Sequence, residues 1–153
     1  MAPVFIEAPV DSPAARELLA EYFEERIAGF DTTTGSYRVT HPDPAAFVAP
    51  RGVFLVVEDG GEAVGCGGVR MLDAGRAEIK HLYLRDSTRG RGFGRMLLAG
   101  LEDRAGTLGA TVAVLDTNAT LTAAGGLSRA AGYSEPEPYN DNPNATLWFR
   151  KDL

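Results

Sequence analysis

The chain has 153 residues, 44% of them hydrophobic, and a formal net charge of −6. These values are typical of a globular protein; the acidic excess argues against nucleic acid as the main partner, and no run of about 18 apolar residues predicts a membrane span. A single cysteine, Cys66, excludes an internal disulfide and, because no secretion signal is visible, favours a cytoplasmic protein.

The first part of the chain predicts a strand, a helix and a loop. Residues 3–7 form a short apolar run, and Asp11–Ser12–Pro13 supplies a capping side chain followed by a proline at a helix start. Apolar residues then recur at helical spacing up to Gly29. Residues 31–50 are polar and interrupted by prolines, so we expect a loop with one short helix at 43–48.

Three strands joined by tight turns follow. Residues 53–57 are rich in β-branched side chains, and Asp59–Gly60–Gly61 is typical of a hairpin turn. The returning strand, 63–72, contains three glycines, which indicate a bulge or the close approach of another backbone. A second turn leads into the strand 76–84. We expect Cys66, which has no histidine in a catalytic pattern, to be a small buried residue.

The second part of the chain predicts alternating helices and strands. A helix follows residue 92 and ends at Gly109, a strand covers 112–115, and a second helix ends at Gly132. Gly125–Gly126 within that helix predicts a close packing partner, because glycine otherwise weakens a helix. A last strand covers 145–150. This order predicts one α+β (α/β layered) domain over residues 1–153, with a mixed, mostly antiparallel sheet.

The stretch Ala77–Leu101 is the most informative part of the chain. A strand leads into a turn rich in arginine and glycine, and a helix begins directly after it. The free N–H groups at such a helix start favour an anion, above all a phosphate or pyrophosphate, and Arg89, Arg91 and Arg95 favour the same partner. The spacing is neither GxGxxG nor GxxxxGK[ST], so a dinucleotide fold and an NTP-hydrolysing loop are not predicted. A glycine-rich helix start with solvated arginines remains the structural alternative.

Arg89-Gly90-Arg91-Gly92-Phe93-Gly94 resembles the signature segment of the GNAT superfamily, the Gcn5-related N-acetyltransferases. The resemblance extends to VGCGGVR, AEIKHLYL, LDTN, a helix ending in GY and the final WFRK strand. It implies a GNAT-type acyl-CoA N-acyltransferase fold in which two central strands splay apart and hold acetyl-CoA. The cofactor-binding residues that it implies are Leu82, Tyr83 and Leu84 for the pantetheine, Arg89, Gly90, Arg91, Gly92, Phe93, Gly94 and Arg95 for the pyrophosphate, and Asn118, whose alternative role is a helix N-cap.

Acetyl transfer to an amine requires a base, because an ammonium group has no lone pair. Glu78 is the candidate: it lies eleven residues before Arg89, the offset at which the histone-acetyltransferase branch places its glutamate. The alternative is a surface-facing glutamate paired with Lys80 or Arg76. His81 is the competing residue, and in a regular strand it points to the opposite face from Glu78 unless a bulge reverses it.

Other parts of the implied chemistry are less defined. Many members protonate the leaving thiolate with a tyrosine at the position of Ser128, so water, Ser128 itself, Tyr133 or Tyr139 would have to serve here. The backbone N–H of Leu82 is the implied donor to the thioester carbonyl. The substrate pocket is expected from the first helix and two loops, and the candidates, each with packing as the alternative, are Tyr37, Arg38, His41, Phe47, Tyr139 and Asn140.

The resulting hypothesis is an acetyl-CoA-dependent N-acetyltransferase. It would acetylate a primary amine, preferably of a small molecule, by direct attack in a ternary complex, with no metal. A catalytically silent CoA-binding sensor, another acyl donor, and a peptide or protein amine as acceptor are the alternatives. The sequence does not distinguish a monomer from a homodimer.

Overall fold

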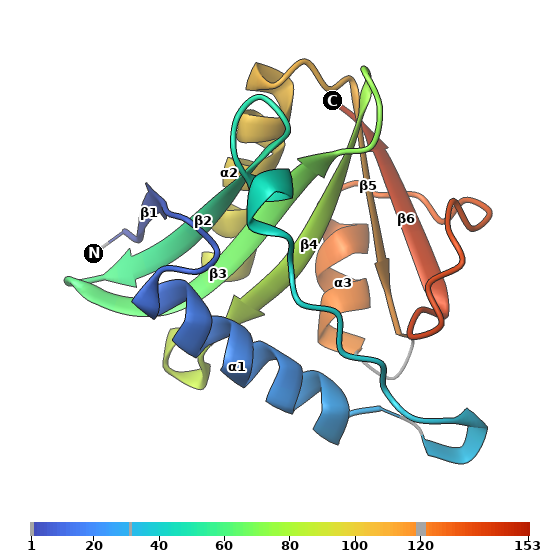
Figure 1. Cartoon of the computed structure of the whole chain (residues 1–153), viewed down its shortest axis with the longest axis horizontal. Coiled ribbons are helices and arrows are strands. Elements are labelled where there is room, and N and C mark those ends of the chain that lie inside the picture. Colours follow the sequence, from blue (N-terminus) through green and yellow to red (C-terminus); the bar gives the residue numbers. More distant parts are fainter. Residues whose placement is uncertain (1, 31, 119–121) are drawn as a thin grey trace.

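The computed structural model describes residues 2–30, 32–118 and 122–153, and its centre is one mixed sheet of six strands (Figure 1). The strands lie side by side in chain order, and every neighbouring pair is antiparallel except the fourth and fifth, which are parallel. Their bounds are β1 (Val4–Glu7), β2 (Gly52–Asp59), β3 (Glu62–Met71), β4 (Arg76–Leu84), β5 (Val112–Thr117) and β6 (Leu147–Asp152).

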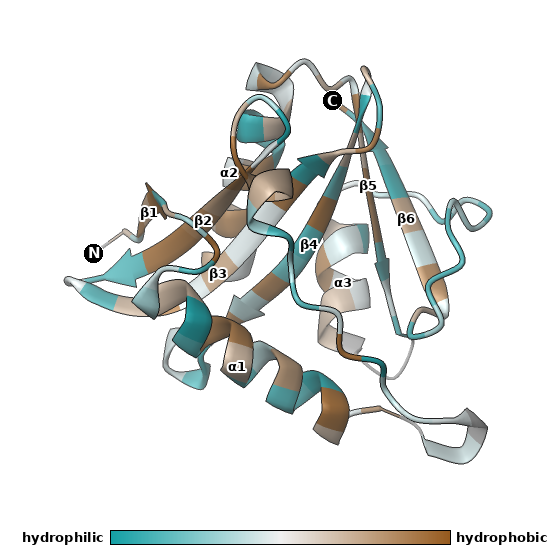
Figure 2. Cartoon of the chain, viewed as in Figure 1, coloured by the Kyte–Doolittle hydropathy of each residue, from teal (hydrophilic) through white to brown (hydrophobic). Residues whose placement is uncertain are grey.

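Helices cover both faces of this sheet. In Figure 1, α1 (Pro13–Ala28) crosses in front of the sheet, whereas α2 (Phe93–Thr107) and α3 (Thr122–Ala130) lie behind it. Short 3-10 turns lie at Thr32–Thr34, Pro44–Phe47 and Asp86–Thr88. The face under α2 forms the larger apolar core, and a second core lies under α1. Figure 2 shows the apolar residues concentrated on β2, β3 and the helix faces turned toward them.

The helix start at Pro13 is confirmed, but its capping bond is not. Ser12 occupies the N-cap position, yet its side chain makes no capping hydrogen bond and its buried hydroxyl has no partner within the described residues. Proline at the first position already fixes the backbone, and it lacks one of the N–H groups that a helix start leaves without an intrahelical partner. Gly29 ends the helix as expected.

The glycines of β3 lie at a bulge and at a close backbone approach, as the sequence indicated: a Cβ atom on Gly65 would lie 2.6 Å from the Tyr83 carbonyl oxygen. The pairing of β3 with β4 shifts register between Cys66 and Gly68, which is a bulge. A Cβ atom on Gly68 would lie 2.7 Å from the Phe47 ring, and one on Gly67 would lie 2.8 Å from Leu101. The close approach of Leu101 to one face and Phe47 to the other therefore depends on these two glycines.

Two details of the second part of the chain differ from the expectation. The last strand is β6, shifted from 145–150 to Leu147–Asp152. Nothing lies within 4 Å of a Cβ atom placed on Gly126, and the nearest neighbour of Gly125 is Arg129 of the same helix. The predicted close packing partner was therefore wrong for Gly126, whereas a Cβ atom on Gly125 would make an ordinary contact with Leu147 of β6 at 3.9 Å.

The parallel pairing between β4 and β5 is short, and it leaves an opening between the two strands. Only three rungs connect the strands, from Arg76–Val112 to Glu78–Val114. Beyond Glu78 the two strands separate, and Figure 1 shows α3 behind the opening between them. The predicted splay of the central strands is thus present, and residues 79–84 have no strand partner on the β5 side.

Gly68→Ala should destabilise the protein by about 1–3 kcal/mol, because the new methyl group would displace the buried rings of Phe47 and Phe54. Gly106→Ala is the matched control. It lies within α2, nothing surrounds it within 4 Å, and it should stabilise the chain by about 0.5–1 kcal/mol. Urea unfolding of both variants measures the difference, and equal stabilities would contradict the packing argument.

Candidate active site

A bulge in β4 places His81 on the face of the sheet that α1 covers. His81 and Leu82 together lie opposite Gly67, and His81 has a left-handed backbone with φ of 58°. The thiol of the buried Cys66 donates to the His81 carbonyl at 3.4 Å, and burial raises the pKa of that thiol, so it remains protonated. The bulge therefore reverses the direction of His81, and Glu78, Lys80 and His81 all project from one face.

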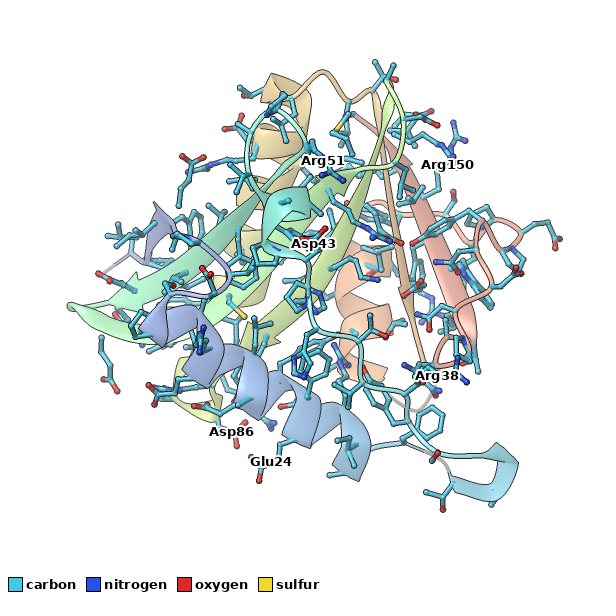
Figure 3. All side chains as sticks on the ribbon, viewed as in Figure 1. Glu24, Arg38, Asp43, Arg51, Asp86 and Arg150 are labelled. Carbon is cyan, nitrogen blue, oxygen red and sulfur yellow. The ribbon has the colours of Figure 1, made fainter. Side chains whose placement is uncertain are left out.

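A cavity of about 860 Å³ lies between this face, α1 and two loops. Five of the six predicted pocket residues line it, namely Tyr37, Arg38, His41, Phe47 and Asn140. Tyr139, the sixth, is not a lining residue. Figure 3 shows Arg38 and Asp43 on the loop that passes over the sheet, so the loop forms one wall.

Glu78 lies at the point where β4 and β5 separate, and its carboxylate is bound on both oxygens. Oε1 accepts from Arg70 Nε at 2.7 Å, and Lys80 Nζ lies 3.7 Å away; Oε2 accepts from the Tyr139 hydroxyl at 2.7 Å. The residue is 1% exposed. Glu78 is therefore buried rather than surface-facing, with Arg70 in place of Arg76 as its main partner, and it lies behind the residues that line the cavity.

The Tyr139 hydroxyl donates a hydrogen bond to this carboxylate. Burial, followed by the negative charge of Glu78, raises the pKa of Tyr139 far above its ordinary value, so the hydroxyl stays protonated. The hydroxyl hydrogen of Tyr139 is therefore engaged in the hydrogen bond to Glu78. The sequence placed Tyr139 in the pocket but did not indicate this contact, because the two residues are 61 positions apart.

Asp116, on the other arm of the opening, is a lining residue that the sequence argument did not select. Its carboxylate accepts from Asn140 Nδ2 at 2.6 Å and from Asn142 Nδ2 at 3.2 Å, and Trp148 Nε1 donates to Asn140 Oδ1 at 2.8 Å. This network fixes the loop after α3 against β5 and β6. Strand pattern alone marked Asp116 only as a strand end.

Asn144 joins the two loops over the cavity. Its side chain accepts from the Arg38 N–H at 2.9 Å and donates to the Arg38 carbonyl at 2.7 Å, the pattern of a strand partner. Asn118 Nδ2 donates to the Asn144 carbonyl at 3.1 Å. Asn118 therefore supports the loop, and its alternative role as an N-cap concerns residues 119–121, which lie outside the described residues.

At the other end of the cavity lies the glycine-rich turn. Gly90 and Gly92 have φ of 73° and 75°, and Gly92 precedes α2 directly. Within the described residues no group accepts from the N–H groups of Gly92, Phe93, Gly94 or Arg95, whereas the Arg91 N–H donates to the Thr88 carbonyl at 3.3 Å. Four N–H groups at this helix start therefore have no acceptor within the described residues, an arrangement that can bind an anion.

The three arginine side chains beside the turn differ in their interaction partners. Arg91 binds Asp59 with two nitrogens, at 2.7 and 3.2 Å, and stacks over the buried Phe93 ring. Arg89 pairs with Asp86 in an exposed position. Arg95 is exposed and has no ion-pair partner in the described part of the chain, so it has the freest cationic head beside the turn.

The strand edge that leads to this turn is open. Leu82, Tyr83 and Leu84 line the cavity. Tyr83 and Leu84 pair with β3, Leu82 lies in the bulge, and none of the three pairs with β5. The Tyr83 hydroxyl donates to Glu21 of α1 at 2.9 Å, and burial raises the pKa of Tyr83 to about 12. The side chain thus serves helix packing, and the backbone edge remains available to an extended ligand.

The residues considered as a general acid are all engaged. Ser128 lines the cavity but donates to the Ala124 carbonyl of its own helix at 3.0 Å. Tyr133 lies in the core and donates to Glu102 at 2.8 Å, away from the cavity lining. With Tyr139 held by Glu78, none of the three presents an unused proton to the cavity.

These parts fit a ligand with an anionic end and an extended polar arm. The free N–H groups and Arg95 suit a pyrophosphate, and the open edge at 82–84 suits amide groups that pair like a strand. Neither the described helices nor the described side chains provide a membrane span or a cluster of three metal-binding residues.

Comparison with known proteins agrees with this geometry. The model of the family described as Acetyltransferase (GNAT) family matches residues 13–133. An uncharacterized N-acetyltransferase of Schizosaccharomyces pombe is 33% identical over 141 residues, which cover 90% of this chain and 85% of the relative.

Solved structures share the fold. An acyl-CoA N-acyltransferase of Klebsiella pneumoniae superposes with a TM-score of 0.78 at 24% identity, over 99% of this chain and 97% of the other. The PaiA N-acetyltransferase of Thermoplasma acidophilum, solved with coenzyme A, gives 0.77 at 14% identity over the whole of both chains. The predicted fold class is confirmed, and the chain belongs to the GNAT acetyltransferase family of acetyl-CoA-dependent acyltransferases.

Proposed function

We propose that this protein transfers an acetyl group from acetyl-CoA to the primary amine of a small molecule, by direct attack with both substrates bound. One observation carries the proposal. A single cavity connects the open edge of β4, which leads to the glycine turn, with the polar cluster around Glu78. The amine and the thioester can therefore meet at the bulge without a covalent enzyme intermediate.

The cosubstrate would lie along β4. The N–H groups of Gly92, Phe93, Gly94 and Arg95 would bind the pyrophosphate, and Arg91, through its contacts with Thr88 and Asp59, would hold the turn in shape. Backbone groups of 82–84 would pair with the pantetheine arm, and the N–H of Leu82 would donate to the thioester carbonyl. The coenzyme A in the Thermoplasma neighbour supports the same cosubstrate here.

Glu78 is the proposed base. Because its carboxylate is 1% exposed and lies behind Lys80 and Asn140, the amine proton would reach it through a bridging water. His81 is a poorer base. Burial, with the nearby charges of Lys80 and Arg70, lowers its pKa to about 3, so its imidazole is neutral but would hold a proton weakly.

The leaving thiolate would depart without a protein acid. Ser128, Tyr133 and Tyr139 each donate to an acceptor of the protein. A thiol with a pKa of about 8.5 leaves with little assistance near neutral pH. The buried free thiol of Cys66 suits the proposed setting, a reducing compartment such as the cytoplasm.

The contact between the two loops over the cavity favours a small-molecule acceptor over a protein acceptor. Asn144 joins them through both backbone groups of Arg38, and this contact bridges part of the cavity mouth. A polypeptide would have to enter beside this contact, whereas a small molecule fits within about 860 Å³.

Glu78→Gln should lower kcat/KM by roughly 10²–10⁴-fold and leave the Kd for CoA unchanged, since it removes the proton acceptor but keeps the shape. Steady-state thiol release and calorimetric titration with CoA measure the two effects. Glu102→Gln is the control, because Glu102 is also largely buried and ion-paired but does not line the cavity. Unchanged turnover in Glu78→Gln would remove Glu78 from this role.

Gly92→Val should weaken CoA binding by about 100-fold or more, because a β-branched residue at φ of 75° would displace several N–H donors at once. Gly109→Val is the matched control: it imposes a similar strain at φ of 100°, at the opposite end of α2. Calorimetry should show normal CoA affinity for the control. Normal affinity of Gly92→Val would place the pyrophosphate elsewhere.

His81 should remain neutral from pH 8 to about pH 5, because its folded pKa is about 3. Its unfolded pKa is about 6.5, so the unfolded chain binds more protons between these values. The free energy of unfolding should therefore fall as the pH decreases below about 6.5, by up to about 1.4 kcal/mol per pH unit.

Proton NMR follows the imidazole directly, and His81→Asn, which tolerates a positive φ, identifies its resonance. That variant should also lose the acid-dependent decrease in stability. A titration midpoint near 6.5 for His81 would contradict its burial in the folded state.

A further inference from the structure

Four cationic side chains line the end of the cavity at which the acceptor would bind. Arg70 and Lys80 project from β3 and β4 beside Glu78, while Arg26 comes from α1 and Arg38 from the loop above. Figure 3 shows Arg38 on that loop, and its backbone pairs with the Asn144 side chain. These four side chains come from four separate segments, so their meeting is a property of the cavity rather than of a local sequence.

Their donor groups are largely unused. Arg70 contacts Glu78 through Nε alone, and within the described residues its two terminal nitrogens have no hydrogen-bond partner. The Arg70 side chain is 42% exposed. Lys80 Nζ is 3.7 Å from Glu78, which is longer than a hydrogen bond. Arg26 stacks 4.9 Å from the centre of the Tyr22 ring, and Arg38 uses only its backbone groups.

The carboxylates around the same space are mostly occupied by protein donors. Asp116 is held by Asn140 and Asn142, and Asp43 accepts from the Ala45 N–H. Glu78 is held by Arg70 and Tyr139. Glu25, the remaining lining carboxylate, is exposed on α1. The free hydrogen-bonding capacity of the cavity is therefore mainly cationic.

The behaviour of His81 reflects the same imbalance. Burial is the main reason that its pKa is lowered, and the charges of Lys80, Arg70 and Arg26 then act in the same direction. The positive charges of Lys80 and Arg70 on the sheet and of Arg26 on α1 thus all act on His81.

We infer that the acceptor is an amine that also carries a carboxylate, such as an amino acid, and that the terminal nitrogens of Arg70 together with Lys80 bind this carboxylate. The inference rests on the proposed function and names the substrate class of that site. A guanidinium with two free nitrogens matches the two oxygens of a carboxylate, and the ammonium of Lys80 adds a second donor. Because both cations adjoin Glu78, the carboxylate would hold the neighbouring amine beside the base.

The test compares amines that differ only by the carboxylate. Thiol release from acetyl-CoA is measured with the purified protein for three matched pairs: glycine against methylamine, β-alanine against ethylamine, and 4-aminobutanoate against propylamine. The common α-amino acids and a short peptide with a free N-terminus are measured in the same way. At least one acid should exceed the matching amine without a carboxylate in kcat/KM by about 10- to 100-fold, the contribution expected of charge-assisted hydrogen bonds.

Lys80→Met should lower this ratio about tenfold, mainly through KM for the acid, whereas Lys80→Arg should restore most of it. The ratio, rather than the absolute rate, is the readout, because Lys80 also lies near Glu78. Arg51→Met is the control: it removes the same charge from an exposed residue outside the cavity lining and should leave the ratio unchanged.

The outcomes separate the two proposals. Equal thiol release with the acids and with the amines that lack a carboxylate, or preference for the peptide, would overturn the inference and leave the acetyltransferase proposal in place. An unchanged ratio in Lys80→Met would remove Lys80 from recognition and overturn the assigned carboxylate site. Absence of thiol release with every amine, despite CoA binding, would overturn the proposed function and the inference with it.

Discussion

The early end of pairing between β4 and β5 is the constraint on which the site depends. Three rungs join the strands, and the ladder stops at Glu78. A buried strand edge normally requires partners for its N–H and C=O groups, because unpaired backbone groups in the interior cost free energy. Here the edge faces a cavity, so water or an extended ligand can satisfy it. A few residues farther along, the bulge at His81 and Leu82 interrupts the ladder with β3, which resumes at Tyr83.

Side-chain hydrogen bonds then hold the loops that cover this opening. Asp116 binds two asparagines of the loop after α3, Trp148 binds one of them, and Asn144 connects the loop to Arg38. Irregular segments of this kind have few backbone partners, so they depend on side chains for their shape. The asparagines supply both donors and acceptors, which allows one residue type to join a carboxylate, an indole and a peptide group.

The sequence specified the local parts of this arrangement well and the long-range parts poorly. The strand 76–84 and the turn before α2 follow from adjacent residues, because strand patterning and the need of Gly92 for a positive φ are local properties. Arg70 and Asp116 were missed because their relevance arises from strand register and from the width of the opening. The Tyr139–Glu78 contact was missed for the same reason. The capping bond of Ser12 and the packing of Gly126 were wrong because a local preference does not reveal which neighbours the fold supplies.

Arg70 joins the two halves of the proposed chemistry in one side chain. A buried carboxylate needs a cation close by, and Arg70 Nε meets this need for Glu78 at 2.7 Å. Arg70 lines the cavity, and within the described residues its two terminal nitrogens have no hydrogen-bond partner, so binding a second carboxylate would not require it to leave Glu78. Lysine at this position could not do both in fixed geometry, because its ammonium is a single point of charge. A substrate carboxylate would therefore offset positive charge in the cavity while Glu78, the proposed base, kept its ion pair with Arg70. Binding of the substrate acid would thus leave Glu78 in place for proton transfer.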